Sequence, residues 1–157
     1  MIIIGYQGIG KSSIARVNPF TSIDLESSWT KIDGQRPDDW AKIYCQIAEG
    51  LSRAGYNVFV SSHKVVQDIL AKSQEHVLAV FPSPEIKREW LERLRLRWEV
   101  TGEEKNYRAW KGAEAGYDRE IEVLMASPFE KYVINDMNYR LEGVITAIVN
   151  KPGTIIY

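Results

Sequence analysis

The segment that most constrains the fold of this chain lies at its start, where four apolar residues lead into the pattern G-x-x-x-x-G-K-S. The pattern begins at Gly5 and ends with Gly10, Lys11 and Ser12. A buried strand that runs into a glycine-containing loop and then a helix forms a cradle for the phosphates of a nucleotide. The start of the helix adds unpaired N–H groups and the positive end of its dipole. The sequence therefore predicts a phosphate loop at residues 5–12, with a helix beginning near Lys11.

The residues of this loop have distinct roles in that interpretation. Lys11 can reach the β- and γ-phosphates, and the hydroxyl of Ser12 can bind Mg²⁺. The other residues expected to bind the nucleotide are Gly5, Gln7, Gly8, Ile9, Gly10 and Ser13. The dinucleotide pattern G-x-G-x-x-G is absent. The expected ligand is therefore a nucleoside triphosphate.

Composition narrows the class of protein. The 157 residues are enough for one domain with a sizeable core. A formal net charge of −1 provides no basic field that would attract nucleic acid. No apolar run approaches the roughly 18 residues of a membrane span, and the start of the sequence lacks the basic region and cleavage site of a signal peptide. The lone cysteine, Cys45, lies on an apolar helical face, so we expect a core thiol in a cytoplasmic protein.

Short apolar strands alternate with helical stretches along the chain. The expected strands cover residues 2–4, 22–25, 57–60, 76–81 and 131–134. Pro37 is suited to a helix start, and Gly55 lies just beyond the end of the same helix. This alternation predicts a parallel sheet with helices on both faces. Ligands bind such sheets at the carboxyl ends of the strands, where the phosphate loop emerges.

Two acidic residues, Asp24 and Glu26, lie at the end of the second expected strand. Their alternate spacing places both carboxylates on one side of an extended segment. A magnesium nucleotide needs carboxylate oxygens nearby, directly or through water. A phosphoryl acceptor needs a group that orients or deprotonates its hydroxyl. Both residues are therefore candidates for catalysis, and Asp24 is also a candidate metal ligand. The alternative is that they are two solvated charges.

Two arginines border the apolar stripe of the helix expected at residues 85–100. Arg93 and Arg97 each precede a member of this four-residue repeat. A buried arginine is costly unless an anion pairs with it, and guanidinium groups match phosphate oxygens. We expect at least one of the two to stabilise a transferring phosphoryl group. The alternative is that both pair with carboxylates of the same helix.

A further set of residues offers cationic and aromatic side chains for a second ligand. Lys31, Arg36 and Trp40 lie within residues 29–40, and His63 follows the third expected strand. Aromatic rings can stack on a base, and a cation can hold an acceptor phosphate. These four residues are candidates for substrate binding. The alternatives are a core role for Trp40 and a loop or helix-start role for His63.

Taken together, these motifs resemble the nucleoside monophosphate kinase group of P-loop kinases, with shikimate- and gluconate-type kinases as near relatives. The resemblance covers most of the chain in order. It includes the loop at 5–12, the acidic pair at 24–26, the strand exit and arginine-bearing helix at 81–97, and the last strand and turn at 134–136. The compact layout also resembles kinase-like proteins encoded by bacteriophages.

This resemblance implies a three-layer α/β/α P-loop fold whose five-stranded parallel sheet has the order 2-3-1-4-5. It implies one domain over residues 1–157, with an acceptor-binding insert at about 28–54 and a mobile lid at about 98–112. It also implies Mg²⁺ and ATP as the donor, and a small-molecule acceptor. No nucleic-acid or membrane partner is expected, and a homodimer is one option for the oligomeric state.

Two departures from the family pattern leave the acceptor open. The third expected strand ends in Ser61-Ser62-His63, without the acidic residue that many P-loop proteins place there. The Asp-Gly-Phe-Pro-Arg stretch of adenylate kinases is also absent. Three hypotheses follow. The leading one is a kinase of nucleoside or deoxynucleoside monophosphates. The others are a kinase of a small non-nucleotide hydroxy metabolite, and a nucleotide-binding regulator with little kinase activity.

Overall fold

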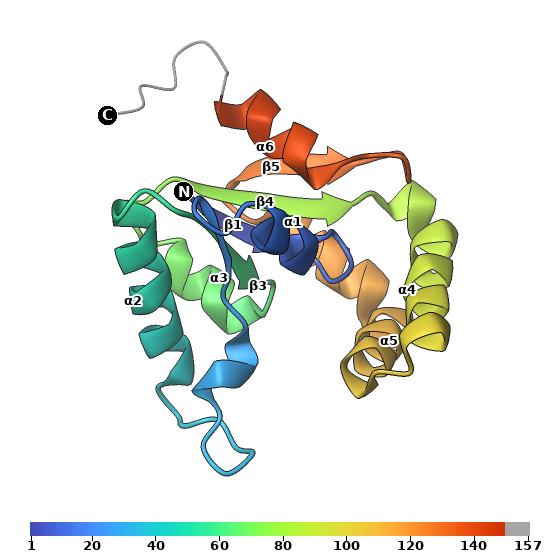
Figure 1. Ribbon diagram of the computed structural model, residues 1–157, viewed down its shortest axis with the longest axis horizontal. Helices are drawn as coiled ribbons and strands as arrows, with labels where there is room; N and C mark the ends of the chain where they lie inside the picture. Colours follow the sequence, from blue (N-terminus) through green and yellow to red (C-terminus); the bar gives the residue numbers. More distant parts are fainter. Residues whose placement is uncertain (150–157) are drawn as a thin grey trace.

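A parallel sheet with helices around it forms the centre of the computed structural model, which describes residues 1–149 (Figure 1). The strands are β1 (Ile2–Gly5), β2 (Ser22–Asp24), β3 (Asn57–Ser61), β4 (Val77–Pro82) and β5 (Glu130–Ile134). Their order is β2-β3-β1-β4-β5, and neighbouring strands pair in parallel. The predicted P-loop sheet order is confirmed.

Helices connect the strands. They are α1 (Lys11–Val17), α2 (Trp40–Arg53), α3 (Lys64–Leu70), α4 (Lys87–Thr101), α5 (Glu104–Ala126) and α6 (Leu141–Val149), with 3-10 turns η1 (Ser27–Thr30) and η2 (Pro84–Ile86). In Figure 1, α2 and α3 lie to the left, and the arrows of β4 and β5 point toward the α4–α5 pair at the right. Among residues 1–149, no helix combines the length and the hydrophobicity needed to cross a membrane.

The central strands are buried because their side chains are almost all apolar. Every residue of β1 and β4 is buried, as expected for strands covered on both faces. Ile3 of β1 lies between Phe59 of β3 and Leu78 of β4. Since parallel strands end at one edge of a sheet, the loops after β1, β2 and β3 emerge side by side. That edge carries the candidate site.

The segment expected to form a lid, 98–112, is the tip of a helical hairpin made by α4 and α5. Gly102, at a φ of 65°, ends α4 in the left-handed conformation and lets the chain reverse. Trp98 stacks on Trp110 with ring centroids 5.2 Å apart, and Tyr107 packs against both rings. Aromatic contacts therefore pack α4 against α5 near the tip of the hairpin. The mobility expected of a lid stays a prediction.

Candidate functional site

The loop after β1 needs glycine at the positions that the sequence pattern singles out. Gly8 and Gly10 have φ values of 88° and 104°, which side chains rarely adopt. A Cβ on Gly8 would lie 2.8 Å from Cδ2 of Leu94 on α4. A Cβ on Gly5 would lie 2.5 Å from Cδ1 of Ile9 within the loop itself. The loop is therefore folded too tightly for larger residues at these points.

Two aromatic side chains hold the carbonyl groups of the loop. Nε1 of Trp90 on α4 donates a hydrogen bond to the carbonyl oxygen of Gln7 at 3.0 Å. The hydroxyl of Tyr139, just before α6, donates to the carbonyl oxygen of Ile9 at 2.9 Å. The rings of Trp90 and Tyr139 stack with centroids 5.8 Å apart.

The N–H groups of the same loop are left available. Within residues 1–149, those of Gly8, Gly10 and Lys11 donate no hydrogen bond. Backbone N–H groups that converge at such a loop form an anion-binding concavity. This geometry fits the phosphates of a nucleotide, as the pattern at residues 5–12 predicts.

The side chains that follow the loop bring a hydroxyl, a carboxylate and a buried cation together. Oγ of Ser12 donates a hydrogen bond to Oδ2 of Asp24 at 2.6 Å, and Nζ of Lys11 donates to the carbonyl oxygen of Gly5 at 2.7 Å. Burial lowers the pKa of Lys11, while the charges of Asp24 and Glu26 oppose that shift. A bound phosphate would reinforce the charged form of the lysine.

The hydroxyl of Ser12 and the carboxylate of Asp24 form a pair of hard oxygen ligands that suits Mg²⁺. Among residues 1–149, no group of three or more His, Cys, Asp or Glu side chains could hold a metal by itself. Magnesium at this position would therefore take its remaining ligands from water and from a nucleotide. This is the usual way in which proteins bind that ion.

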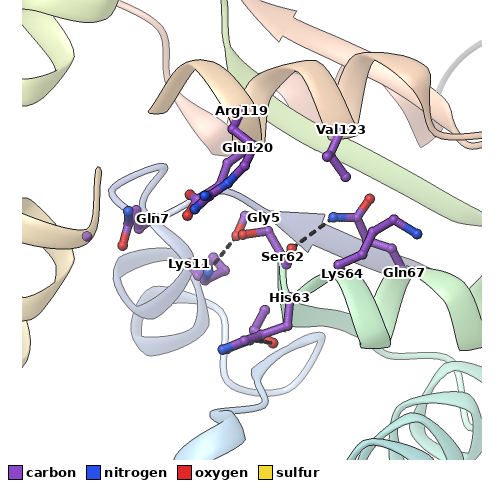
Figure 2. A pocket seen from close by; sticks show the side chains of 12 residues that line it. Gly5, Gln7, Lys11, Ser62, His63, Lys64, Gln67, Arg119, Glu120 and Val123 are labelled. Carbon is purple, nitrogen blue, oxygen red and sulfur yellow. Dashed lines mark hydrogen bonds between the residues drawn. The ribbon is translucent and has the colours of Figure 1, made fainter. Parts of the chain in front are cut away.

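Three cavities meet at the phosphate loop. The central cavity, of about 200 Å³, contains Lys11, Ser12 and Asp24, and Glu26 and Arg97 also line it. The Tyr139 cavity, of about 280 Å³, lies beside the turn of the loop; Gly8, Ile9, Gly10, Ser13, Arg93 and Tyr139 are among its lining residues. The large cavity, of about 530 Å³, is shown in Figure 2. The large and central cavities share Gln7, Lys11 and Ser61.

The two predicted arginines take different positions. The guanidinium of Arg93 lies over the rings of Trp90 and Tyr139, at 5.5 and 5.4 Å from their centroids. Its Nη1 atom is buried and has no hydrogen-bond partner in the described part of the chain. Arg97 is exposed and faces the central cavity. Neither pairs with a carboxylate of α4 within residues 1–149, where Arg95 forms the ion pairs with Glu92 and Glu99.

Three of the four residues predicted to bind a substrate form a continuous row. The guanidinium of Arg36 lies 4.4 Å from the ring centroid of Trp40, whose ring meets that of His63 edge-on at 5.5 Å. His63 lines the large cavity and shares a hydrogen bond with Ser61 at 2.8 Å. Burial and the nearby charges of Arg36 and Lys11 lower the pKa of His63. Lys31 is exposed and lines none of the three cavities.

Sequence reasoning missed the contribution of α5. Lys105 and Asn106 line the central cavity, and Arg119 and Glu120 line the large cavity. The residues of α5 that line the two cavities are Lys105, Asn106, Ala109, Gly112, Arg119, Glu120 and Val123. Most of these residues are polar or small and repeat at helical spacing beside the apolar stripe of α5, a pattern that by itself is also typical of a solvated face.

A scan against protein-family models finds no match for this chain, and a search of the curated proteins finds none. Several solved structures share its architecture, among them the following two. Shikimate kinase from Bacteroides thetaiotaomicron matches with a TM-score of 0.54 and 11% identity over 94% of each chain. The tunicamycin resistance protein of Deinococcus radiodurans matches with a TM-score of 0.57 and 16% identity over 98% of this chain and 96% of that chain. The fold is that of P-loop kinases. At these identities the likeness shows the fold alone.

Proposed function

We propose that this protein is an ATP-dependent phosphotransferase that acts on a small molecule. The observation that carries this proposal is the position of Lys11 in the wall shared by two cavities. The central cavity has the hydroxyl, carboxylate and cationic groups that a magnesium nucleotide requires. The large cavity offers room for a second molecule at the same lysine. A nucleotide-dependent switch needs the first cavity but has no use for the second.

The phosphate loop and the residues around it form the site of the phosphoryl donor. The free N–H groups of the loop and the Lys11 ammonium would bind phosphate oxygens, and Ser12 and Asp24 would hold Mg²⁺. The bound magnesium nucleotide supplies the phosphoryl group and part of the charge neutralisation. Arg97, from α4, and Lys105, from α5, face the same cavity and stabilise the negative charge of the transferring group. The Tyr139 cavity, with Arg93 over two rings, receives the rest of the nucleotide.

The acceptor reacts through an oxygen atom, which is a phosphate oxygen in a nucleoside monophosphate and a hydroxyl oxygen in a small hydroxy metabolite. This oxygen bonds to the γ-phosphorus while the bond to the bridging oxygen breaks, and ADP leaves with that electron pair. An ionised phosphate oxygen has no proton to lose, whereas a hydroxyl passes its proton to Glu26, the carboxylate of the central cavity that is not assigned to Mg²⁺. A nucleoside monophosphate and a small hydroxy metabolite both satisfy this chemistry. The row of Arg36, Trp40 and His63 favours the first, and the polar lining of the large cavity favours the second.

A coupled assay of ADP release tests the proposed function. The purified protein is incubated with Mg²⁺ and ATP, and acceptors from three panels are added: nucleoside and deoxynucleoside monophosphates, hydroxy acids and sugar phosphates, and neutral polyols. We expect one panel to stimulate ADP release above the rate without acceptor, and Lys11→Ala to abolish the stimulation. Tight ATP binding without stimulation by any compound would instead support the regulator hypothesis.

A further inference from the structure

Nine of the twelve residues that line the large cavity have polar or charged side chains, and the lining residues come from β3, the loop after it, α3, α5 and the phosphate loop with the start of α1 (Figure 2). We propose that it binds the phosphoryl acceptor, that this acceptor is a non-nucleotide with an anionic group and free hydroxyls, and that Arg119 and Glu120 of α5 select it. This inference rests on the proposed phosphotransferase function and deepens it. It names the class of acceptor and two specificity-determining residues.

The lining of the large cavity argues against a nucleobase. No Phe, Tyr or Trp side chain lines it, and its one aromatic side chain, His63, already packs edge-on against Trp40. Sites for flat apolar ring systems are mostly lined by hydrophobic and aromatic side chains. Here Ser61, Ser62 and Gln67 form much of the surface instead. A volume of about 530 Å³ suits one small molecule, and hydrogen-bonding walls suit one with several hydroxyls.

Of the cationic residues that line the large cavity, Arg119 is the one that is available to bind the acceptor. Lys64 forms an ion pair with Asp68 on its own helix. Burial and the charges of Arg36 and Lys11 lower the pKa of His63, so His63 is a weaker cation than an ordinary histidine. Lys11 faces the donor phosphates through the shared wall. Arg119 makes no ion pair or hydrogen bond within residues 1–149, although the Glu120 carboxylate lies near its guanidinium over Gly116. Its guanidinium is suited to bind a carboxylate or a phosphate group by two parallel hydrogen bonds.

A glycine on α5 lets Arg119 and Glu120 reach the cavity. A Cβ on Gly116 would lie 2.8 Å from Oε1 of Glu120 and 3.3 Å from Nη2 of Arg119. Both side chains therefore fold back over Gly116 toward the start of the helix, the usual direction for helical side chains. Figure 2 shows them extending from α5 toward the phosphate loop, opposite the α3 residues.

Glu120 adds a hydrogen-bond acceptor beside this cation. An ionised carboxylate accepts hydrogen bonds and donates none, so it suits the hydroxyls of an acceptor. The carboxylate also lies close to the phosphate loop. Burial raises the pKa of the Tyr6 phenol in that loop, and the charge of Glu120 contributes to the same shift. A hydroxyl bound at Glu120 is thereby held near the loop that binds the donor.

The inference is tested with ligands that share a carbon skeleton and differ in charge. Glucose, gluconate and glucose 6-phosphate form one series, a wider panel of hydroxy acids and sugar phosphates extends it, and AMP and dTMP represent nucleotides. Thermal stabilisation is measured without ATP, and ADP release with ATP. We expect the anionic sugars or hydroxy acids to act in both assays, and the more effective anion distinguishes a carboxylate from a phosphate acceptor. The inference is overturned if AMP or dTMP acts best, if neutral compounds equal their anionic counterparts, or if no anionic compound acts.

Variants of α5 then separate specificity from folding. Arg119→Gln is expected to raise the KM for the anionic acceptor tenfold or more, with KM for ATP unchanged. Glu120→Gln is expected to raise the acceptor KM as well. Gly116→Ala places a Cβ 2.8 Å from Oε1 of Glu120 and 3.3 Å from Nη2 of Arg119, so it shifts the Glu120 carboxylate and moves Arg119 slightly, and it should raise the acceptor KM by less than Arg119→Gln without removing a charge. Gly50→Ala, in α2, has open space around its Cβ and is the matched control. An unchanged acceptor KM in Arg119→Gln would refute the role of Arg119, whereas ADP release that no acceptor stimulates would refute the phosphotransferase function itself.

Discussion

At the scale of single residues, the contact between Ser12 and Asp24 makes the clearest prediction about metal use. Asp24→Asn keeps an oxygen for the Ser12 hydroxyl but removes the charge that attracts Mg²⁺. We expect the Mg²⁺ concentration for half-maximal activity to rise about tenfold, the effect of about 1.4 kcal/mol of lost binding free energy. A magnesium titration of ADP release measures it. Glu26→Gln is the comparison variant: we expect it to lower the rate with a hydroxyl acceptor, because Glu26 is the proposed proton acceptor, but to leave the half-maximal Mg²⁺ concentration unchanged, because its carboxylate accepts a hydrogen bond from Ser28 and not from Ser12. Equal shifts in both variants would contradict the assignment of Asp24.

A second prediction at this scale concerns the ionisation and the reactivity of the Cys45 thiol. Burial raises the pKa of Cys45 to about 12 from an ordinary value of 9.0, so the folded protein keeps the thiol neutral. As the pH rises through 9 the unfolded chain loses the thiol proton while the folded chain retains it, so this group lowers stability at alkaline pH. We expect an aromatic disulfide reagent at pH 8 to label Cys45 only after denaturation. Rapid labelling of the native protein would contradict its burial.

At the scale of elements, α4 holds the phosphate loop through one hydrogen bond. Trp90→Phe keeps a ring against Tyr139 but leaves the Gln7 carbonyl without its donor. We expect the free energy of unfolding to fall by about 1–3 kcal/mol and the KM for ATP to rise several-fold. Denaturant unfolding and ATP titration measure the two effects. Trp98→Phe is the matched control, because Trp98 lies two turns further along α4 and packs against the aromatic cluster of the hairpin. A higher KM for ATP in both variants would argue against a specific role for Trp90.

The elements also show what the sequence could predict. The expected strand at 2–4 is β1 (Ile2–Gly5), an apolar run of β-branched residues, and that at 131–134 is β5 (Glu130–Ile134), whose second half is the aromatic and β-branched segment Tyr132–Ile134. The helix expected at 85–100 is α4 (Lys87–Thr101), which begins two residues later because the preceding residues form the 3-10 turn η2 (Pro84–Ile86). Contacts between segments that are far apart in the sequence could not be predicted from such local patterns. Tyr139 reaches the loop across 130 residues of sequence, and the cavity-facing side of α5 reads as an ordinary solvated face.

At the scale of the whole molecule, the order of the strands explains why three cavities meet at one loop. β1 lies at the centre of the sheet, with β3 on one side and β4 on the other. The loop after β1 therefore has the ends of β2 and β3 on one flank and the α4–α5 hairpin on the other. Lys11, at the start of α1, lines both the central cavity, which holds the Ser12–Asp24 pair, and the large cavity. In the proposed phosphotransferase, these two cavities are the donor side and the acceptor side, and Lys11 lies between them.

The most direct test of this account follows the phosphoryl group itself. ATP labelled at the γ-phosphate is incubated with the wild-type protein and with Lys11→Ala, in the presence of the acceptor that the screen selects. We predict that label appears on the acceptor with the wild-type protein and falls by on the order of a thousandfold with Lys11→Ala. Circular dichroism should show the same fold for both proteins. Near-normal transfer of label by a folded Lys11→Ala variant would contradict the central claim.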